Sequence, residues 1–426
     1  MVVLADGLTH LGTVGKHRLA RHAGWMFAAQ GARIALQGAY FIVIARALGT
    51  SGYGLFEAAL AIIVILAPFA GWGTGQLLVM RVARDRTSFP VYWGNAILMT
   101  IVTAVPLTLL VVLVGGRLVP DLSVWLLLLL ALAQFVFGKL AEQSVQAFQA
   151  FERMKGAALL TVLPAMCRLT AALLFVQVTR TPTPQGWSVL YLASTVVGTA
   201  VTLTAVTRLL GRPVLRPMVL WREAKDGGYF SIGAAAENIY ADIDKAMLAR
   251  LATLNDAGIY AAAYRATFMA FTPVRSLLAA AYPRFFRSGQ QGIGGSLGLA
   301  IRLLPVAVAV SAAASLGLVL VAPLVPSILG DDYHDSIEAL RWLAVLPLLQ
   351  SLDYLAGDTL SGAGYQGIRS AVQAGVIPLN VSLNLWLIPL YSWKGAAWAT
   401  LISEGTLVLG LWVTVWIISR RKADVA

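Results

Sequence analysis

Long apolar runs constrain this chain more than any other feature of its sequence. Twelve of them can be read along the 426 residues, each long enough to cross the roughly 30 Å of bilayer hydrocarbon as a helix. They are residues 22–46, 54–80, 91–114, 123–150, 157–179, 187–207, 228–250, 257–283, 300–322, 336–361, 370–389 and 395–418. The runs are continuous rather than alternating, which excludes a transmembrane β-barrel. The sequence therefore predicts an all-α integral membrane protein with about 12 transmembrane helices.

The composition excludes several other classes of protein. Hydrophobic residues make up 58% of the chain and charged residues 12%, whereas a soluble domain carries roughly 25% charged residues. A soluble enzyme, a disordered chain and a disulfide scaffold are therefore excluded. The single cysteine, Cys167, permits neither an intrachain disulfide nor a thiolate metal cluster. We expect no cofactor and no metal site.

The net charge of +12 indicates orientation in the membrane. With the N-terminus inside, the predicted cytoplasmic segments hold 20 Lys and Arg residues and the outer segments hold five. Such an asymmetry follows the positive-inside rule. We therefore predict a multi-pass protein of the inner (plasma) membrane with both termini in the cytoplasm, and no nucleic-acid partner.

The two halves of the chain resemble each other weakly. A shift of 204 residues aligns residues 45–46 with 249–250, and Gly54 with Gly258. Since each half holds six spans, the halves would enter the membrane from the same side and be related by a pseudo-twofold axis along its normal. The predicted parts are a cytoplasmic N-terminal segment at 1–21, an N-lobe at 22–207, a basic cytoplasmic loop at 208–227, a C-lobe at 228–418 and a cytoplasmic tail at 419–426.

Charged side chains inside the predicted spans need partners or a wet cavity, because charge is costly in lipid. Local pairs at helical spacing are expected for Lys139 with Glu142, Asp242 with Lys245, and Glu338 with Arg341. Four arginines have no acid three or four residues away: Arg33, Arg168, Arg265 and Arg275.

The spans at 228–250 and 257–283 carry the highest density of polar residues. Together with the first span they supply candidates for substrate binding: Arg33, Gln37, Asn238, Tyr240, Lys245, Arg265 and Arg275. The candidates for ion coupling or gating are acids: Glu57, Glu237, Asp242 and Asp244. An alternative interpretation is a salt-bridge network that locks a gate, for instance between Asp244 and Arg265.

Three motifs then resemble the polysaccharide-transporter flippases of the multidrug/oligosaccharidyl-lipid/polysaccharide (MOP) exporter superfamily. Residues 45–56 read ARALGTSGYGLF, residues 244–250 and 257–265 read DKAMLAR and AGIYAAAYR, and residues 395–404 read GAAWATLISE. The resemblance implies two six-helix lobes of the MATE/MOP type, alternating access, and a cavity lined by the first, second, seventh and eighth spans. It implies transport of a polyprenyl-(pyro)phosphate-linked oligosaccharide to the outer leaflet for cell-surface polysaccharide synthesis.

Other functions stay open at this point. A multidrug/cation antiporter of the same superfamily shares the two-lobe plan, although such a protein would favour unopposed acids over arginines. A membrane-embedded glycosyltransferase or polymerase fits less well, since all the outer loops are short. The expected partners of a flippase are its lipid-linked oligosaccharide, the bilayer, a coupling ion such as H⁺ or Na⁺, and polysaccharide assembly machinery.

Overall fold

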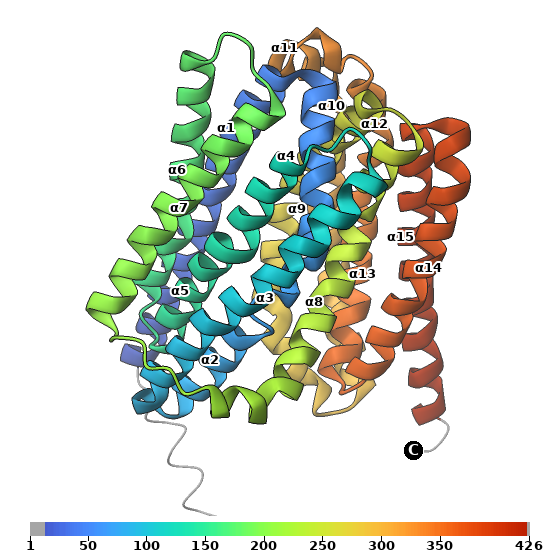
Figure 1. Ribbon diagram of the computed structural model, residues 1–426. Coiled ribbons are helices and arrows are strands. Elements are labelled where there is room, and N and C mark those ends of the chain that lie inside the picture. The colour runs from blue at the N-terminus through green and yellow to red at the C-terminus, as the bar shows by residue number, and fades with distance from the viewer. Residues whose placement is uncertain (1–12, 424–426) are drawn as a thin grey trace, which may run out of the picture. The chain divides into compact units, whose positions relative to one another are not determined.

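The computed structural model describes residues 13–423, without some of the side chains at 13–27, 219–237, 280 and 421–423. Every regular element in that range is a helix (Figure 1). The α-helices are α1 (Thr13–Leu66), α2 (Thr74–Arg84), α3 (Phe89–Leu118), α4 (Val124–Ala131), α5 (Lys139–Ala150), α6 (Met154–Val178), α7 (Pro184–Leu209), α8 (Pro217–Leu251), α9 (Leu254–Gly289), α10 (Ile293–Val321), α11 (Val325–Leu329), α12 (Ser336–Leu343), α13 (Leu346–Gly362), α14 (Gln366–Tyr391) and α15 (Trp393–Ala423).

Short 3-10 and π segments complete the chain. The 3-10 turns are η1 (Ala67–Phe69), η2 (Arg86–Ser88), η4 (Ala322–Leu324) and η5 (Asp331–Tyr333). A π-helix, η3 (Leu132–Gly138), lies between α4 and α5. Together, α4, η3 and α5 form the predicted span at 123–150.

The twelve predicted spans are mostly helical, but they differ in how apolar they are. The span at 54–80 is interrupted by the 3-10 turn η1 and a turn at residues 70–73, where Gly71, Trp72 and Gly73 have positive φ. Eight stretches in the described residues are long and apolar enough to cross a membrane, and the first, Ala28–Arg84, is long enough for two of the predicted spans. Helices α8 and α9 fall outside this group because polar and charged residues interrupt them. The predicted span at 336–361 is divided between α12 and α13. The chain is a multi-pass, all-α membrane protein.

A kink at Gly49 separates the first two predicted spans within α1. Gly49 has φ of 65° and ψ of 178°, a conformation that glycine adopts without steric penalty. A break between the predicted spans 22–46 and 54–80 is therefore confirmed, although the turn is so tight that helix runs on both sides of it.

The chain forms two compact units. Unit 1 comprises the chain up to Ile44, Ile63–Arg117 and Leu122–Ala235, and unit 2 comprises Ala45–Ile62, Leu118–Asp121 and the chain from Ala236 onward. Unit 2 therefore includes a piece of α1, which Tyr333 holds by donating a hydrogen bond of 3.0 Å to the carbonyl of Ala45. The predicted pseudo-twofold relation between 22–207 and 228–418 stays a prediction.

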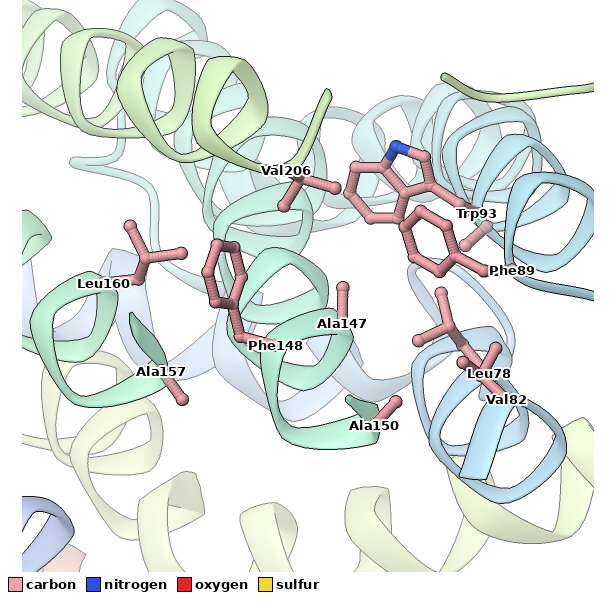
Figure 2. Packing of buried hydrophobic residues seen from close by; sticks show 11 residues of the cluster. Leu78, Val82, Phe89, Trp93, Ala147, Phe148, Ala150, Ala157, Leu160 and Val206 are labelled. Atoms are coloured by element: carbon pink, nitrogen blue, oxygen red, sulfur yellow. The ribbon is translucent and has the colours of Figure 1, made fainter. Parts of the chain in front are cut away.

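Aromatic side chains fill the core of unit 1 near one end of its helices. Phe89 and Trp93 of α3 stack with ring centroids 6.2 Å apart (Figure 2). Phe148 of α5 and Val206 of α7 belong to the same buried cluster, to which α2 and α6 also contribute. Burying each such side chain stabilises the fold by about 1.5–3 kcal/mol in water, and less where lipid is the reference.

The loop between α7 and α8 is held to α3 through its backbone. The side-chain amide of Asn95 donates to the carbonyl of Arg216, and its oxygen accepts from the Arg216 N–H, each at 3.0 Å. The N–H of Val214 also donates to the carbonyl of Pro90 at 2.7 Å. This basic loop is thus hydrogen-bonded to α3 within unit 1.

Unit 2 has its own apolar clusters. Val274, Leu278 and Phe285 of α9 pack with residues of α10 and α13, including Leu355. A second cluster joins α13, α14 and α15, which include Leu360, Val376 and Leu411. Helices α8, α9 and α15 are positioned by this core, and they carry the polar side chains described next.

Candidate functional site

The three motif stretches, residues 45–56, 244–265 and 395–404, all lie in unit 2. Two of them approach closely at Gly54 and Gly258. A Cβ atom on Gly258 would overlap the backbone of Thr50, and one on Gly54 would overlap that of Leu254. Thr50 and Asn255 are also hydrogen-bonded through their side chains. Glycine is therefore needed at both positions for the part of α1 that follows the Gly49 kink to lie against the start of α9.

Glu57 and Arg265 form an ion pair beside this contact. Arg265 Nη2 lies 3.1 Å from Glu57 Oε1, and Tyr53 donates to the same oxygen at 2.7 Å. The Arg265 side chain is 35% exposed, whereas that of Glu57 is 10% exposed. Glu57 thus neutralises an arginine that has no acidic neighbour along its own helix.

Lys245 is surrounded by acids and an aromatic ring. It forms the predicted ion pair with Asp242, and its Nζ lies 4.3 Å from the centroid of the Tyr264 ring. It also interacts electrostatically with Asp244 and Glu57. This buried cation is therefore neutralised within unit 2.

Asp244 is buried and accepts hydrogen bonds from three directions. Tyr260 donates to it from α9, Thr400 donates from α15 at 3.4 Å, and the backbone N–H of Lys245 donates at 2.8 Å. The hydroxyls of Tyr260 and Thr400 are 2.9 Å apart. Asp244 therefore ties α8 to α9 and α15, and Arg265, its predicted partner in a salt bridge, pairs with Glu57.

A second buried acid joins α8 to α15. Tyr240 of α8 donates a hydrogen bond to Glu404 Oε2. Glu404 is 3% exposed and interacts electrostatically with Asp353 of α13. We define the unit-2 polar network as Glu57, Tyr240, Asp242, Asp244, Lys245, Tyr260, Tyr264, Arg265, Thr400 and Glu404.

The structure does not bring every predicted residue to this network. Arg33 and Gln37 lie one turn apart on the part of α1 that belongs to unit 1, and both are partly exposed. Arg275 lies on α9 with an exposed side chain, and Asn238 on α8 is partly exposed. The Glu237 side chain lies outside the described residues.

Two further predicted ion pairs gave different results. Lys139 and Glu142 pair as expected, at 3.1 Å. The pairing of Glu338 with Arg341 was wrong, because Glu338 instead contacts Lys394 at the start of α15, at 2.9 Å. Helical spacing permits the local pair, but the neighbouring helix presents a competing cation.

Comparison with known proteins decides the family. A family model described as "Polysaccharide biosynthesis protein" matches residues 19–288, more than half of the chain. The chain belongs to the polysaccharide biosynthesis protein family. No curated protein matches it by sequence.

Solved structures share the fold of this polysaccharide biosynthesis protein at low sequence identity. A multidrug resistance MATE family transporter of the MOP superfamily, in an inward-facing conformation, has a TM-score of 0.75 at 17% identity, over 91% of this chain and 96% of that one. An outward-facing MATE family transporter has a TM-score of 0.65 at 16% identity, over 94% and 96%. A MOP superfamily transporter from Pyrococcus furiosus, whose binding pocket of reverse polarity suggests a different function, has a TM-score of 0.66 at 16% identity, over 94% and 96%.

Sequence analysis of this polysaccharide biosynthesis protein missed several members of the network. Tyr260, Tyr264 and Thr400 lie inside the motif stretches, so their motifs were recognised but the residues were not assigned to a site. Glu404, the last residue of the third motif stretch, was likewise not assigned to a site. The signal that they share is a polar side chain on a motif stretch within an otherwise small or apolar helix.

Proposed function

We propose that this protein is a flippase that moves a polyprenyl-(pyro)phosphate-linked oligosaccharide from the cytoplasmic to the outer leaflet of the inner membrane. Membership of the polysaccharide biosynthesis protein family supports the substrate class. The multi-pass helical fold supports movement across a bilayer rather than catalysis beside it. Alternating access between inward- and outward-open states is the mechanism that we infer, with both termini in the cytoplasm.

The observation that carries the proposal is the unit-2 polar network itself. A glycan and a phosphate cannot enter hydrocarbon without replacements for their hydration. The network places charged and hydroxyl groups on α8 and α9, the two helices whose sequences are too polar to pass as ordinary spans. Such groups supply replacement hydrogen bonds for a polar head group, while the prenyl tail stays in lipid.

Arg265 is the residue of the network best suited to hold a phosphate. Its planar guanidinium can bind phosphate through two parallel hydrogen bonds. Glu57 occupies one edge of that guanidinium, and about a third of the side chain is exposed. We infer that the substrate phosphate competes with Glu57 for Arg265. Binding would then loosen the link between α9 and the part of α1 that follows the Gly49 kink.

The test is transbilayer movement in proteoliposomes. The substrate is a short polyprenyl-pyrophosphate sugar with a fluorescent label, and a membrane-impermeant reductant quenches the label in the outer leaflet. We expect the wild-type protein to give complete quenching and Arg265→Gln to slow it at least tenfold. The matched control is Arg302→Gln, which removes an exposed arginine from α10.

Two results would contradict the proposal. Quenching that stops at half in wild-type vesicles, as in vesicles without protein, means that the chain does not move this substrate. A gene deletion that leaves no lipid-linked oligosaccharide trapped on the cytoplasmic face would argue against the function in the cell. Glycosyltransferase genes beside this gene would favour it.

A multidrug/cation antiporter is the second candidate. It is favoured by the buried acids Asp244 and Glu404, which are 3% exposed each and are able to bind a proton or a metal cation. In a flippase the same acids would serve the coupling ion, H⁺ or Na⁺. Efflux of a cationic dye from the same vesicles, without movement of the labelled lipid, would favour the antiporter.

A further inference from the structure

Arg168 of α6 lies in unit 1 with aromatic rings rather than acids as its neighbours. Its guanidinium carbon is 4.1 Å from the ring centroid of Tyr191 and 6.0 Å from that of Tyr40. One hydroxyl, that of Thr195, lies 3.5 Å from Nη2. Across residues 13–423, no described carboxylate lies within ion-pair distance of this arginine.

Three other cations inside the helices are neutralised by acids of the chain. Lys245 pairs with Asp242 and Arg265 with Glu57, while Arg369 at the start of α14 pairs with Asp358 at 3.4 Å. Arg168 differs from these three because ring faces, and no described carboxylate, lie against its charge. Cation–π contacts contribute about 0.5–2 kcal/mol, which is well below the cost of an uncompensated charge in hydrocarbon.

The hydrogen-bonding groups of Arg168 are also largely unused. A guanidinium carries five N–H donors, and among the residues that the structure describes only one acceptor is reached, at the limit of hydrogen-bond distance. Its Nε–H is buried and meets no acceptor in the described part of the chain. Because a buried donor without an acceptor costs about 1–3 kcal/mol, these N–H groups fit a site whose acceptors come from a ligand.

The rings around Arg168 are held firmly in place. Trp187 packs between Tyr40 and Tyr191, with centroid distances of 5.7 and 6.0 Å. Gln134 donates to the Tyr191 hydroxyl at 3.2 Å from the π-helix η3. A single π turn within an α-helix often marks a functional site, because it re-aims one face of the helix. Arg168 thus lies against rings that are themselves packed against Trp187 and, at Tyr191, hydrogen-bonded.

We propose that Arg168, between Tyr40 and Tyr191, is an oxyanion-binding subsite of unit 1. Its ligand is a phosphate or a carboxylate on the head group of the transported molecule, so this inference rests on the proposed function. Both oxyanions match the fork of the guanidinium, and Arg168 as a residue is partly exposed. The chemistry is shared by two sources, the pyrophosphate of a lipid carrier and the carboxylate of an acidic sugar.

The test measures binding to the full chain in phosphatidylcholine nanodiscs. Farnesyl pyrophosphate is the probe, farnesol is the uncharged control, and inorganic pyrophosphate and glucuronate are competitors. We expect Arg168→Gln to weaken binding of farnesyl pyrophosphate about 10- to 100-fold and Arg168→Lys, which lacks the fork, to weaken it by a smaller factor. Arg180→Gln, which removes an exposed arginine just beyond α6, should bind as the wild type does.

The competitors identify the source of the oxyanion. Displacement by pyrophosphate supports a phosphate site, and a glucuronate site would instead show Arg168-dependent binding of that sugar acid. Equal affinity of wild type and Arg168→Gln for both anions would overturn the subsite. If Arg168→Gln does not fold, Arg168→Lys decides, because wild-type affinity in that variant excludes a role for the fork.

Failure of the subsite is distinguishable from failure of the proposed function. Wild-type protein that flips the labelled lipid but shows no Arg168-dependent anion binding retains the function and loses the subsite. Wild-type protein that binds farnesyl pyrophosphate through Arg168 but moves no lipid retains the subsite and loses the function.

Discussion

Replacing Gly258 by alanine tests the contact between the start of α9 and Thr50, which follows the Gly49 kink in α1. The question is whether this contact is as close as the structure shows. The added Cβ would lie 2.7 Å from the carbonyl carbon and 3.0 Å from the Cα of Thr50, and closer still to the carbonyl oxygen. All three are backbone atoms, so no flexible side chain can move aside. Such overpacking costs about 1–3 kcal/mol.

Helix propensity works in the opposite direction. Alanine is better than glycine inside a helix by about 1 kcal/mol. Since the obstacle is backbone, we take the upper part of the overpacking range and expect a net loss of about 1–2 kcal/mol. For a unit of about 200 residues, this lowers the unfolding temperature by about 2–8 °C.

Gly317 provides the matched control. It lies inside α10, and a Cβ atom there would meet nothing within 4 Å. Gly317→Ala should gain the propensity term alone and raise the unfolding temperature. The assay is thermal unfolding of the purified variants in one detergent, followed by the loss of monodisperse protein. Equal shifts in the two variants, or a higher unfolding temperature for Gly258→Ala, would refute the close approach.

Three other substitutions test single contacts. Tyr260→Phe removes a hydrogen bond to the buried Asp244 carboxylate and should cost about 1.5–3 kcal/mol, measured as a lower unfolding temperature; an unchanged temperature would contradict the bond. Glu57→Gln should weaken the hold on Arg265 and raise its accessibility to an arginine-specific dicarbonyl reagent, with the rate for Arg265→Gln as background. Asn95→Ala removes the two hydrogen bonds that the Asn95 side chain makes to the backbone of Arg216, and it should speed tryptic cleavage of the loop between α7 and α8 severalfold. A wild-type cleavage rate would argue against these two bonds.

The helical architecture could be predicted from the sequence because the length and apolarity of a span are local properties. The break at Gly49 was also predictable, since glycine is where a chain turns with positive φ. The division of 336–361 into α12 and α13 was missed, although Pro347 in the first turn of α13 is a local signal for a helix start. Two of the three predicted local ion pairs formed, Lys139 with Glu142 and Asp242 with Lys245, and Glu338 shows how a cation on a nearby helix changes the result.

The candidate site was only partly predictable for a physical reason. Spacing along a helix shows which residues share a face, but it does not show what faces them. Arg265 finds its acid 208 positions earlier in the chain, at Glu57. Arg168 finds no described acid at all, and the sequence treated both arginines alike. The difference between a neutralised arginine and an available one therefore emerges only from the three-dimensional structure.

The piece of α1 that belongs to unit 2 has a consequence for dividing the molecule. A cut in the loop between α7 and α8 would divide the chain into two fragments of six predicted spans each. The N-terminal fragment would, however, keep Ala45–Ile62, including Glu57, and so carry the partner of Arg265 away from it. The C-terminal fragment alone would lack the stretch of α1 that packs in unit 2. Co-expressed fragments would have to associate so that this stretch returns to its place. The smallest piece that can fold as unit 2 is thus not a continuous segment of the chain.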